Sequence, residues 1–200
     1  MSLNGESVTV TRVTHQTSIC IYCGSRPGAD PVYTELAKHV GEMLARRNIR
    51  LVYGGGSIGL MGIVARAALD AGGTVVGVIT RQLDELEVGL REVSLRFIEE
   101  TMHQRKMRMF ELSDGFIALP GGSGTLDEIA EILSWRQLGL HNKPGVLLGH
   151  NGFWEPMRAL LHQMHDHGFL SAGGRDYFHM ATSPEDAIDY IERMIDAGRT

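Results

Sequence analysis

The chain has 200 residues, of which 43% are apolar and 22% are charged, and its net charge is −5 with histidine counted as neutral. These values are typical of an ordinary globular protein of one domain and exclude a disordered chain. The negative charge does not support a broad nucleic-acid-binding surface, although it leaves a local basic site open, and no apolar run reaches the ~20 residues that span a bilayer. We therefore expect neither nucleic acid nor a membrane as a partner.

The N-terminal segment, residues 1–17, is polar and lacks the apolar core of a signal peptide. We expect this segment to be flexible, because chain termini fray unless other elements hold them. Residues 18–200 contain no internal repeat and no low-complexity linker, so we expect them to form a single domain. The cytoplasm is the expected compartment.

An apolar run at 19–22 predicts the first strand, and it contains Cys20 with Cys23 directly behind it. A spacing of three along a strand points these two side chains to opposite faces. A redox pair of this spacing usually sits at a helix start, and no second pair completes a zinc site. We expect both cysteines to be buried core residues.

A turn-rich stretch, residues 23–28, follows this strand and precedes a predicted helix over 31–47. Ser25 and Arg26 lie beyond the carboxyl end of the strand, where open α/β sheets bind their ligands. They are candidate ligand contacts. The alternative is ordinary turn chemistry for Ser25 and a solvated charge for Arg26.

A second glycine-rich stretch, residues 54–62, lies between a short strand and a helix and contains G-x-G-x-x-G. The dinucleotide-binding form of this motif needs an acidic residue at the end of the next strand. That strand, 74–79, is followed by Thr80 and an arginine, so the pattern disfavours an NAD site. It favours close approach of a phosphorylated ligand to Gly55 and Gly56; the alternative is tight helix–strand packing alone.

A helix is predicted over 101–112, with Thr101 as its cap. Spacings of i, i+3, i+4 and i+7 place four residues on one side of it. A buried face does not carry two adjacent cations, and a solvated face does not carry two methionines, so this mixed face suits a cleft. The alternative is a helix edge with snorkelling cations. The four residues are Met102, Arg105, Lys106 and Met109.

The most informative stretch is 120–128, Pro-Gly-Gly-Ser-Gly-Thr-Leu-Asp-Glu, between a buried strand at 115–119 and a helix at 129–138. Glycines let a ligand approach the backbone, and the free N–H groups of a first helical turn attract a phosphate. Glu128 on that first turn would repel the phosphate unless a cation intervenes. The alternative is a capping box between Thr125 and Glu128.

Strands continue to alternate with helices to the end of the chain: 81–91 predicts a loop or short helix, and 93–98, 145–148 and 177–181 predict strands. Alternation of this kind predicts an α/β fold, with one doubly wound, Rossmann-like parallel sheet and helices on both faces. The glycine loops after the first, second and fifth strands then meet at one edge. Two further helices are expected, over 153–166 and over 184–197, the second with Ser183 as its cap. Three histidines, His162, His165 and His167, lie on the polar side of the first, where we expect solvated side chains and no metal site.

The run 102–106, Met-His-Gln-Arg-Lys, and the 120–128 motif together resemble the LOG ("Lonely Guy") family. The similarity extends from about residue 19 to about residue 195 and includes the glycine-rich stretches after the first two strands. Members of this family are cytokinin riboside 5′-monophosphate phosphoribohydrolases, long mislabelled as lysine decarboxylases. The resemblance implies hydrolysis of a nucleoside 5′-monophosphate to free base and ribose 5-phosphate, and a homodimer with the site near the subunit interface.

The resemblance also implies roles for individual residues. Arg105 and Glu128 would be the catalytic pair, and residues 121–125 would hold the phosphate. No metal and no cofactor is implied. Loop 82–90 departs from the plant pattern, which leaves open whether the base is prenylated adenine or, as in an AMP nucleosidase, plain adenine. The expected substrate-binding residues, including those noted above, are Ser25, Gly55, Gly56, Glu87, Met102, Lys106, Gly121, Gly122, Ser123, Gly124, Thr125, Leu126 and Asp127.

The chemistry of Glu128 and Arg105 agrees with this activity. Cleavage of an N-glycosidic bond passes through an oxocarbenium-like state that a carboxylate stabilises while it activates water. Arg105 would keep Glu128 ionised beside the phosphate and orient it. The alternative from another class is a non-catalytic nucleotide or molybdenum-cofactor carrier, which does not need this pair. No lysine lies in sequence surroundings that indicate a pyridoxal phosphate site, so the sequence does not favour lysine decarboxylation.

Overall fold

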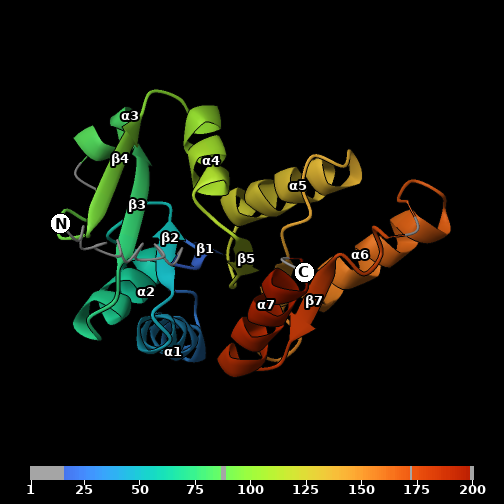
Figure 1. Ribbon diagram of the computed structural model, residues 1–200, viewed down its shortest axis with the longest axis horizontal. Helices are drawn as coiled ribbons and strands as arrows, with labels where there is room; N and C mark the ends of the chain where they lie inside the picture. Colours follow the sequence, from blue (N-terminus) through green and yellow to red (C-terminus); the bar gives the residue numbers. More distant parts are fainter. Residues whose placement is uncertain (1–15, 87–88, 172, 199–200) are drawn as a thin grey trace, which may run out of the picture.

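A computed structural model describes residues 16–86, 89–171 and 173–198 (Figure 1). They contain one sheet of seven parallel strands in the order β4-β3-β2-β1-β5-β6-β7. The predicted α/β fold with a parallel sheet is therefore confirmed. The strands are β1 (Ser18–Tyr22), β2 (Arg50–Tyr53), β3 (Val75–Thr80), β4 (Leu95–Glu99), β5 (Gly115–Ala118), β6 (Gly145–Leu148) and β7 (Phe178–Ala181).

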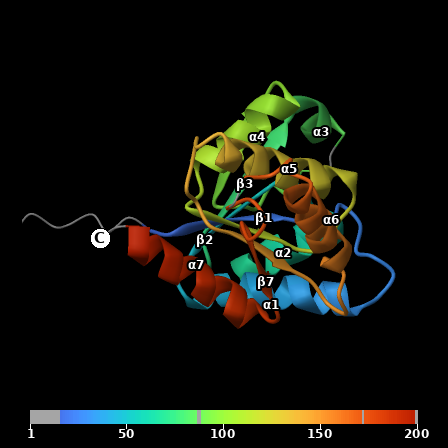
Figure 2. The same ribbon diagram turned by 90° about the vertical axis from the view of Figure 1, so that its right-hand side faces the viewer.

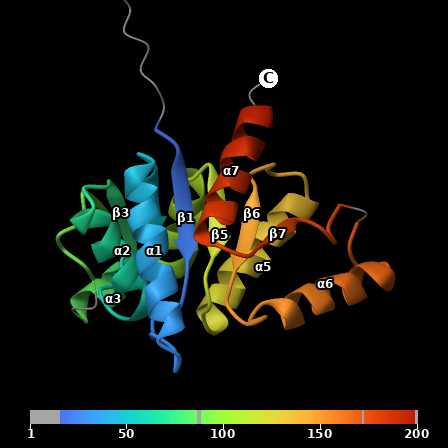
Figure 3. The same ribbon diagram turned by 90° about the horizontal axis from the view of Figure 1, so that it is seen from below.

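Helices cover both faces of the sheet (Figures 2 and 3). One face packs against α1, α2 and α7, and the other against α4, α5 and α6. Cys20 lies in the core of the second face and Cys23 in that of the first, and both are buried free thiols as expected. The helices are α1 (Val32–Arg46), α2 (Gly59–Asp70), α3 (Arg81–Glu85), α4 (Met102–Glu111), α5 (Ser123–Gln137), α6 (Glu155–Asp166) and α7 (Pro184–Gly198).

The strand order reverses at β1, which pairs with β2 on one side and β5 on the other. In an open parallel sheet, the loops at such a switch point diverge to opposite faces and leave a crevice beyond the carboxyl ends of the strands. Here the diverging loops are residues 23–31 after β1 and 119–122 after β5. The backbone N–H of Gly24 donates to Pro120 O at 3.1 Å, which joins the two loops at the floor of the crevice.

Local signals set several helix ends as predicted. Thr101 caps α4 in a capping box with Gln104, and the Ser183 hydroxyl accepts from the N–H of Asp186 at the start of α7. Strand β4 begins two residues later than expected, because the Ser94 side chain rather than the backbone accepts from Val75 N. The expected flexible segment 1–17 lies almost entirely outside the described residues.

No helix of the described residues has the length and apolarity needed to cross a membrane. Within the same residues, no group of three His, Cys, Asp or Glu side chains is arranged to hold a metal ion. His162 and His165 of α6 are partly exposed, and His167 at the C-cap of this helix is exposed.

Candidate active site

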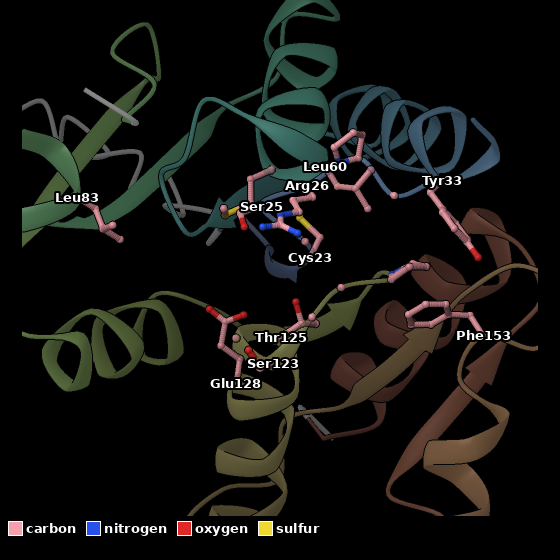
Figure 4. Close-up of a pocket in the computed structure, with 18 of the residues that line it drawn as sticks. Cys23, Ser25, Arg26, Tyr33, Leu60, Leu83, Ser123, Thr125, Glu128 and Phe153 are labelled. Atoms are coloured by element: carbon pink, nitrogen blue, oxygen red, sulfur yellow. The ribbon is translucent and has the colours of Figure 1, made fainter. Parts of the chain in front are cut away.

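A cleft of about 580 Å³ opens at the switch point between β1 and β5. Its volume lies in the range of small-molecule sites. Figure 4 shows Ser123, Thr125 and Glu128 on the α5 side, facing Cys23, Ser25 and Arg26. Tyr33 and Phe153 lie at one end of the view and Leu83 at the other. The remaining lining residues are Gly24, Pro27, Gly28, Leu60, Met61, Met102, Arg105, Pro120, Gly121, Gly122 and Gly124.

The start of α5 forms the anion-binding part of this cleft. The first N–H groups of any helix have no intrahelical acceptor. Here the N-cap is Gly122, which has no side chain to accept from them, so they can bind a ligand instead. A Cβ on Gly122 or Gly124 would meet no atom within 4 Å, so the backbone there is open to a ligand. A Cβ on Gly121 would collide with Oγ1 of Thr125, so position 121 has no room for a residue larger than glycine. Exposed N–H groups and the helix dipole together favour a phosphate.

Glu128 lies in the second turn of α5, because the helix begins at Ser123. The expectation that Glu128 stands on the first turn is therefore wrong. The alternative of a Thr125–Glu128 capping box is also wrong, because the N-cap is Gly122 and not Thr125. One extra turn moves the carboxylate away from the first N–H groups. The phosphate site and the acid thus occupy neighbouring parts of one cleft.

Arg105 reaches Glu128 from α4 and is only 7% exposed. Its Nε donates to Val78 O at 3.0 Å and its Nη2 to Gly54 O at 3.1 Å. Its Nη1 lies 3.4 Å from Glu128 Oε1. Two buried carbonyl acceptors therefore fix the guanidinium plane, and the third nitrogen is directed at the carboxylate.

Gly54, the first glycine of the G-x-G-x-x-G stretch, does not line the cleft but accepts from Arg105 behind it. A Cβ at this position would collide with Nη2 of Arg105. Gly55, at a φ of +74°, packs against Val78 and Ile79, and Gly56 against Met61. These last two glycines do not line the cleft, so the packing alternative describes them better than contact with a phosphorylated ligand.

Burial controls the charge of Glu128, whose side chain is 11% exposed. Desolvation raises the pKa of Glu128 to about 7, and Arg105 lowers it without offsetting the burial. Arg105 thus keeps the carboxyl ionised only in part at neutral pH. A carboxyl that exchanges its proton near pH 7 suits general acid–base chemistry.

The cleft includes several expected binding residues and omits others. Met102 lines it, with Sδ 3.3 Å from Arg105 Nη1, and Ser25 lines it from the β1 loop. Glu87 lies outside the described residues. Lys106 binds Asp127 through an ion pair of 3.0 Å. The expected binding residues that do not line the cleft are Gly55, Gly56, Lys106, Leu126 and Asp127.

Several lining residues carry no sequence signal of a site. Tyr33 and Phe153 come from α1 and the β6–α6 loop, and their rings meet edge to face at 5.8 Å. Each reads as an ordinary core residue in its own segment. Cys23 also borders the cleft, but burial raises the pKa of its thiol well above the usual value, so it is not an activated nucleophile.

The fold and the cleft define a Rossmann-like protein with a small-molecule-sized cleft at the switch point of its sheet, into which the open start of α5 presents N–H groups suited to an anion. A family model described as "Possible lysine decarboxylase" matches residues 61–191. The chain belongs to this family, the LOG family of phosphoribohydrolases.

Two curated relatives carry the same description, cytokinin riboside 5′-monophosphate phosphoribohydrolase. The one from Rhodococcoides fascians is 44% identical over 175 residues, which cover 87% of this chain and 88% of the relative. The one from Arabidopsis thaliana is 39% identical over 192 residues, which cover 96% of this chain and 88% of the relative.

Solved structures confirm the fold. The molybdenum cofactor binding protein from Rippkaea orientalis superposes with a TM-score of 0.71 at 23% identity, covering 91% of this chain and 99% of that one. At this identity the likeness establishes the architecture alone.

Proposed function

We propose that this protein hydrolyses the N-glycosidic bond of a nucleoside 5′-monophosphate and releases the free base and ribose 5-phosphate. The observation that carries the proposal is the pairing of Arg105 with the buried Glu128 in the cleft that also contains the open start of α5. A carrier of nucleotides needs the anion site but has no use for a buried acid with a pKa of about 7. The names of the curated relatives support the same reaction.

The geometry suggests how each group would act. The phosphate would accept from the first N–H groups of α5 at Ser123, Gly124 and Thr125, with Arg26 of the facing loop as a nearby cation. The ribose would then lie against Glu128, one turn further along the helix. As the bond from C1′ to the base nitrogen breaks, the ionised carboxylate stabilises the positive charge that develops on the sugar.

Water completes the reaction. Glu128 orients a water molecule whose oxygen bonds to C1′, and the carboxylate accepts the proton that the water loses. The departing base takes up a proton as it leaves, so the atoms balance with water as the one co-reactant. Arg105 also lines the cleft, and through its Nη1 it would hold the Glu128 side chain in its productive orientation.

Adenine is the proposed base, because the curated relatives act on cytokinin riboside 5′-monophosphates. Both AMP and an N6-prenylated AMP fit the proposal. The thioether of Met102, which is 46% exposed beside Arg105, offers an adaptable apolar surface for either base.

The proposal predicts that the protein converts AMP or isopentenyladenosine 5′-monophosphate to free base and ribose 5-phosphate. Because the α5 N–H groups select the phosphate, we expect adenosine to react at least ~10²-fold more slowly at equal concentration. Chromatography of the free base measures both rates. Release of base from neither nucleotide would favour the carrier alternative, and equal rates with adenosine would contradict the phosphate site.

We also propose a homodimer with the site near its interface, as the LOG resemblance implies. Large apolar side chains are exposed on the two helices that carry the catalytic pair, with Met102 46% and Leu126 45% exposed. A second subunit that covers these side chains would remove their apolar surface from water, which favours association. We expect light scattering to report a dimer that Leu126→Glu disrupts. Leu138 is 73% exposed but lies at the C-cap of α5, at the opposite end of the helix from the cleft, so Leu138→Glu is the control for an interface beside the site. A monomeric wild-type protein at micromolar concentration would contradict this proposal.

A further inference from the structure

Two strand ends form the back wall of the space that the Arg105 guanidinium occupies. Tyr53, the last residue of β2, pairs with Gly77 of β3. Directly beyond this pair lie the carbonyls of Gly54 and Val78. The Nη2 of Arg105 donates to Gly54 O at 3.1 Å and its Nε to Val78 O at 3.0 Å. The carboxyl ends of β2 and β3 therefore hold the guanidinium from behind.

The absence of a side chain at Gly54 has no cause in the backbone. Its φ lies outside the left-handed region that favours glycine, whereas the next residue, Gly55, has a φ of +74°. A Cβ at position 54 would instead stand in the place of Arg105 Nη2, and the next residue that it would meet is Met61, with Sδ at 3.1 Å. The guanidinium thus fills the space that a side chain at position 54 would need.

A methyl group at position 54 would act on the arginine rather than on the fold. The atom in its way is the far end of a long side chain and not a part of the backbone, so the guanidinium can shift while the strands stay in place. Such a shift has a chemical consequence, because Arg105 Nη1 lies 3.4 Å from Glu128 Oε1. A displacement of about 1 Å in a catalytic group can lower a rate by ~10²-fold.

We propose that Gly54 is a positioning residue, whose missing side chain creates the space in which the Arg105 guanidinium is held against Glu128. This role for the first glycine of the G-x-G-x-x-G stretch differs from both contact with a phosphate and packing of a helix on a strand. The kinetic test of this inference rests on the proposed hydrolysis, whereas the test by unfolding does not.

Gly54→Ala is expected to lower kcat for AMP or isopentenyladenosine 5′-monophosphate by ~10²-fold. KM should change less than about threefold, because the variant leaves the phosphate site at the start of α5 intact. Steady-state release of free base at pH 8 measures both constants. A wild-type kcat in a folded Gly54→Ala protein would overturn the inference.

Gly115→Ala is the matched control for crowding in the core. Gly115 is also buried, its φ is also outside the left-handed region, and a Cβ there would likewise meet the end of a flexible side chain, Ile191 Cγ2 at 2.8 Å. It begins β5, at the opposite end of this strand from the cleft. Both variants add one methyl group to a filled space, but only Gly54→Ala crowds Arg105. We expect Gly115→Ala to retain kcat.

Thermal unfolding of a double-mutant cycle tests the same contact without turnover. In the wild type, Gly54→Ala should lower Tm by at least ~2 °C, because the added methyl group collides with a buried guanidinium. In Arg105→Ala the guanidinium is gone. There the same change should leave Tm unchanged or raise it, because alanine at an ordinary φ restricts the unfolded chain.

Each result of the cycle decides the inference. A different effect of Gly54→Ala in the two backgrounds, with the sign given above, supports it, and an equal fall of Tm in both overturns it. Should Gly54→Ala fail to fold, the double variant Gly54→Ala/Arg105→Ala decides: a folded double variant supports the collision with Arg105, and an unfolded one overturns it. If no nucleotide is hydrolysed by the wild type, the proposed function fails while the unfolding cycle still decides this inference.

Discussion

Glutamine in place of Glu128 is expected to lower the rate of N-glycosidic hydrolysis by at least ~10²–10³-fold and to preserve the fold. Glutamine has the size of glutamate but cannot stabilise positive charge on the sugar or accept a proton from water. The side chain caps no helix, so no helix end depends on it. The measurement is single-turnover release of base from AMP, with circular dichroism as the check on folding.

We also expect Glu128→Gln to change how the free energy of unfolding depends on pH, in a direction that the burial of this side chain determines. In the folded protein the pKa of Glu128 is about 7, against an ordinary value of 4.5. A raised pKa means that the folded state binds the proton more tightly than the unfolded state does. The stabilising contribution of the protonated form is therefore complete below pH 4.5 and is lost as pH rises through about 7.

Glutamine does not ionise, so Glu128→Gln does not lose this stability as pH rises. We expect the variant to be more stable than the wild type at pH 8.5 by roughly 2–3 kcal/mol, and the difference to shrink as pH falls toward 4.5. Urea unfolding at pH 5.5 and 8.5 measures it. A variant that unfolds more easily at pH 8.5 and still hydrolyses AMP would show that Glu128 has a structural role instead.

Arg105→Ala is expected to abolish hydrolysis and also to destabilise the protein. Removal of the guanidinium leaves the carbonyls of Gly54 and Val78 without the donor that Arg105 supplied and takes the nearest cation from Glu128. Uncompensated buried groups of this kind cost about 1–3 kcal/mol each, so a total of roughly 2–4 kcal/mol is reasonable. Measurements of kcat and of unfolding in urea separate the two effects.

Arg105→Lys distinguishes charge from geometry. An ammonium keeps the positive charge but cannot match three acceptors with the planar fork of a guanidinium, so we expect it to recover little activity. Arg108→Ala, which removes an arginine of the same helix that pairs outside the cleft, is the control and should retain kcat. A near-normal kcat in Arg105→Ala would contradict the pairing of Arg105 with Glu128.

The sequence alone predicts the elements and their order, because these depend on neighbours along the chain. Apolar runs such as 115–119 and the caps Thr101 and Ser183 are local signals, and the structure confirms them. The turn at Gly121 and Gly122 followed by a helix is equally local, since its N–H groups belong to one segment. From alternating strands and helices, the parallel sheet also follows without coordinates.

Only the tertiary structure decides which side chains meet and what charge they carry. Arg105 and Glu128 are 23 positions apart, and their contact depends on how α4 and α5 pack beside each other. Lys106 is equally cationic in the sequence, yet one position along the helix turns it from the cleft to Asp127. Desolvation likewise depends on the whole surroundings of a group, so the raised pKa of Glu128 becomes visible only after the fold has buried it.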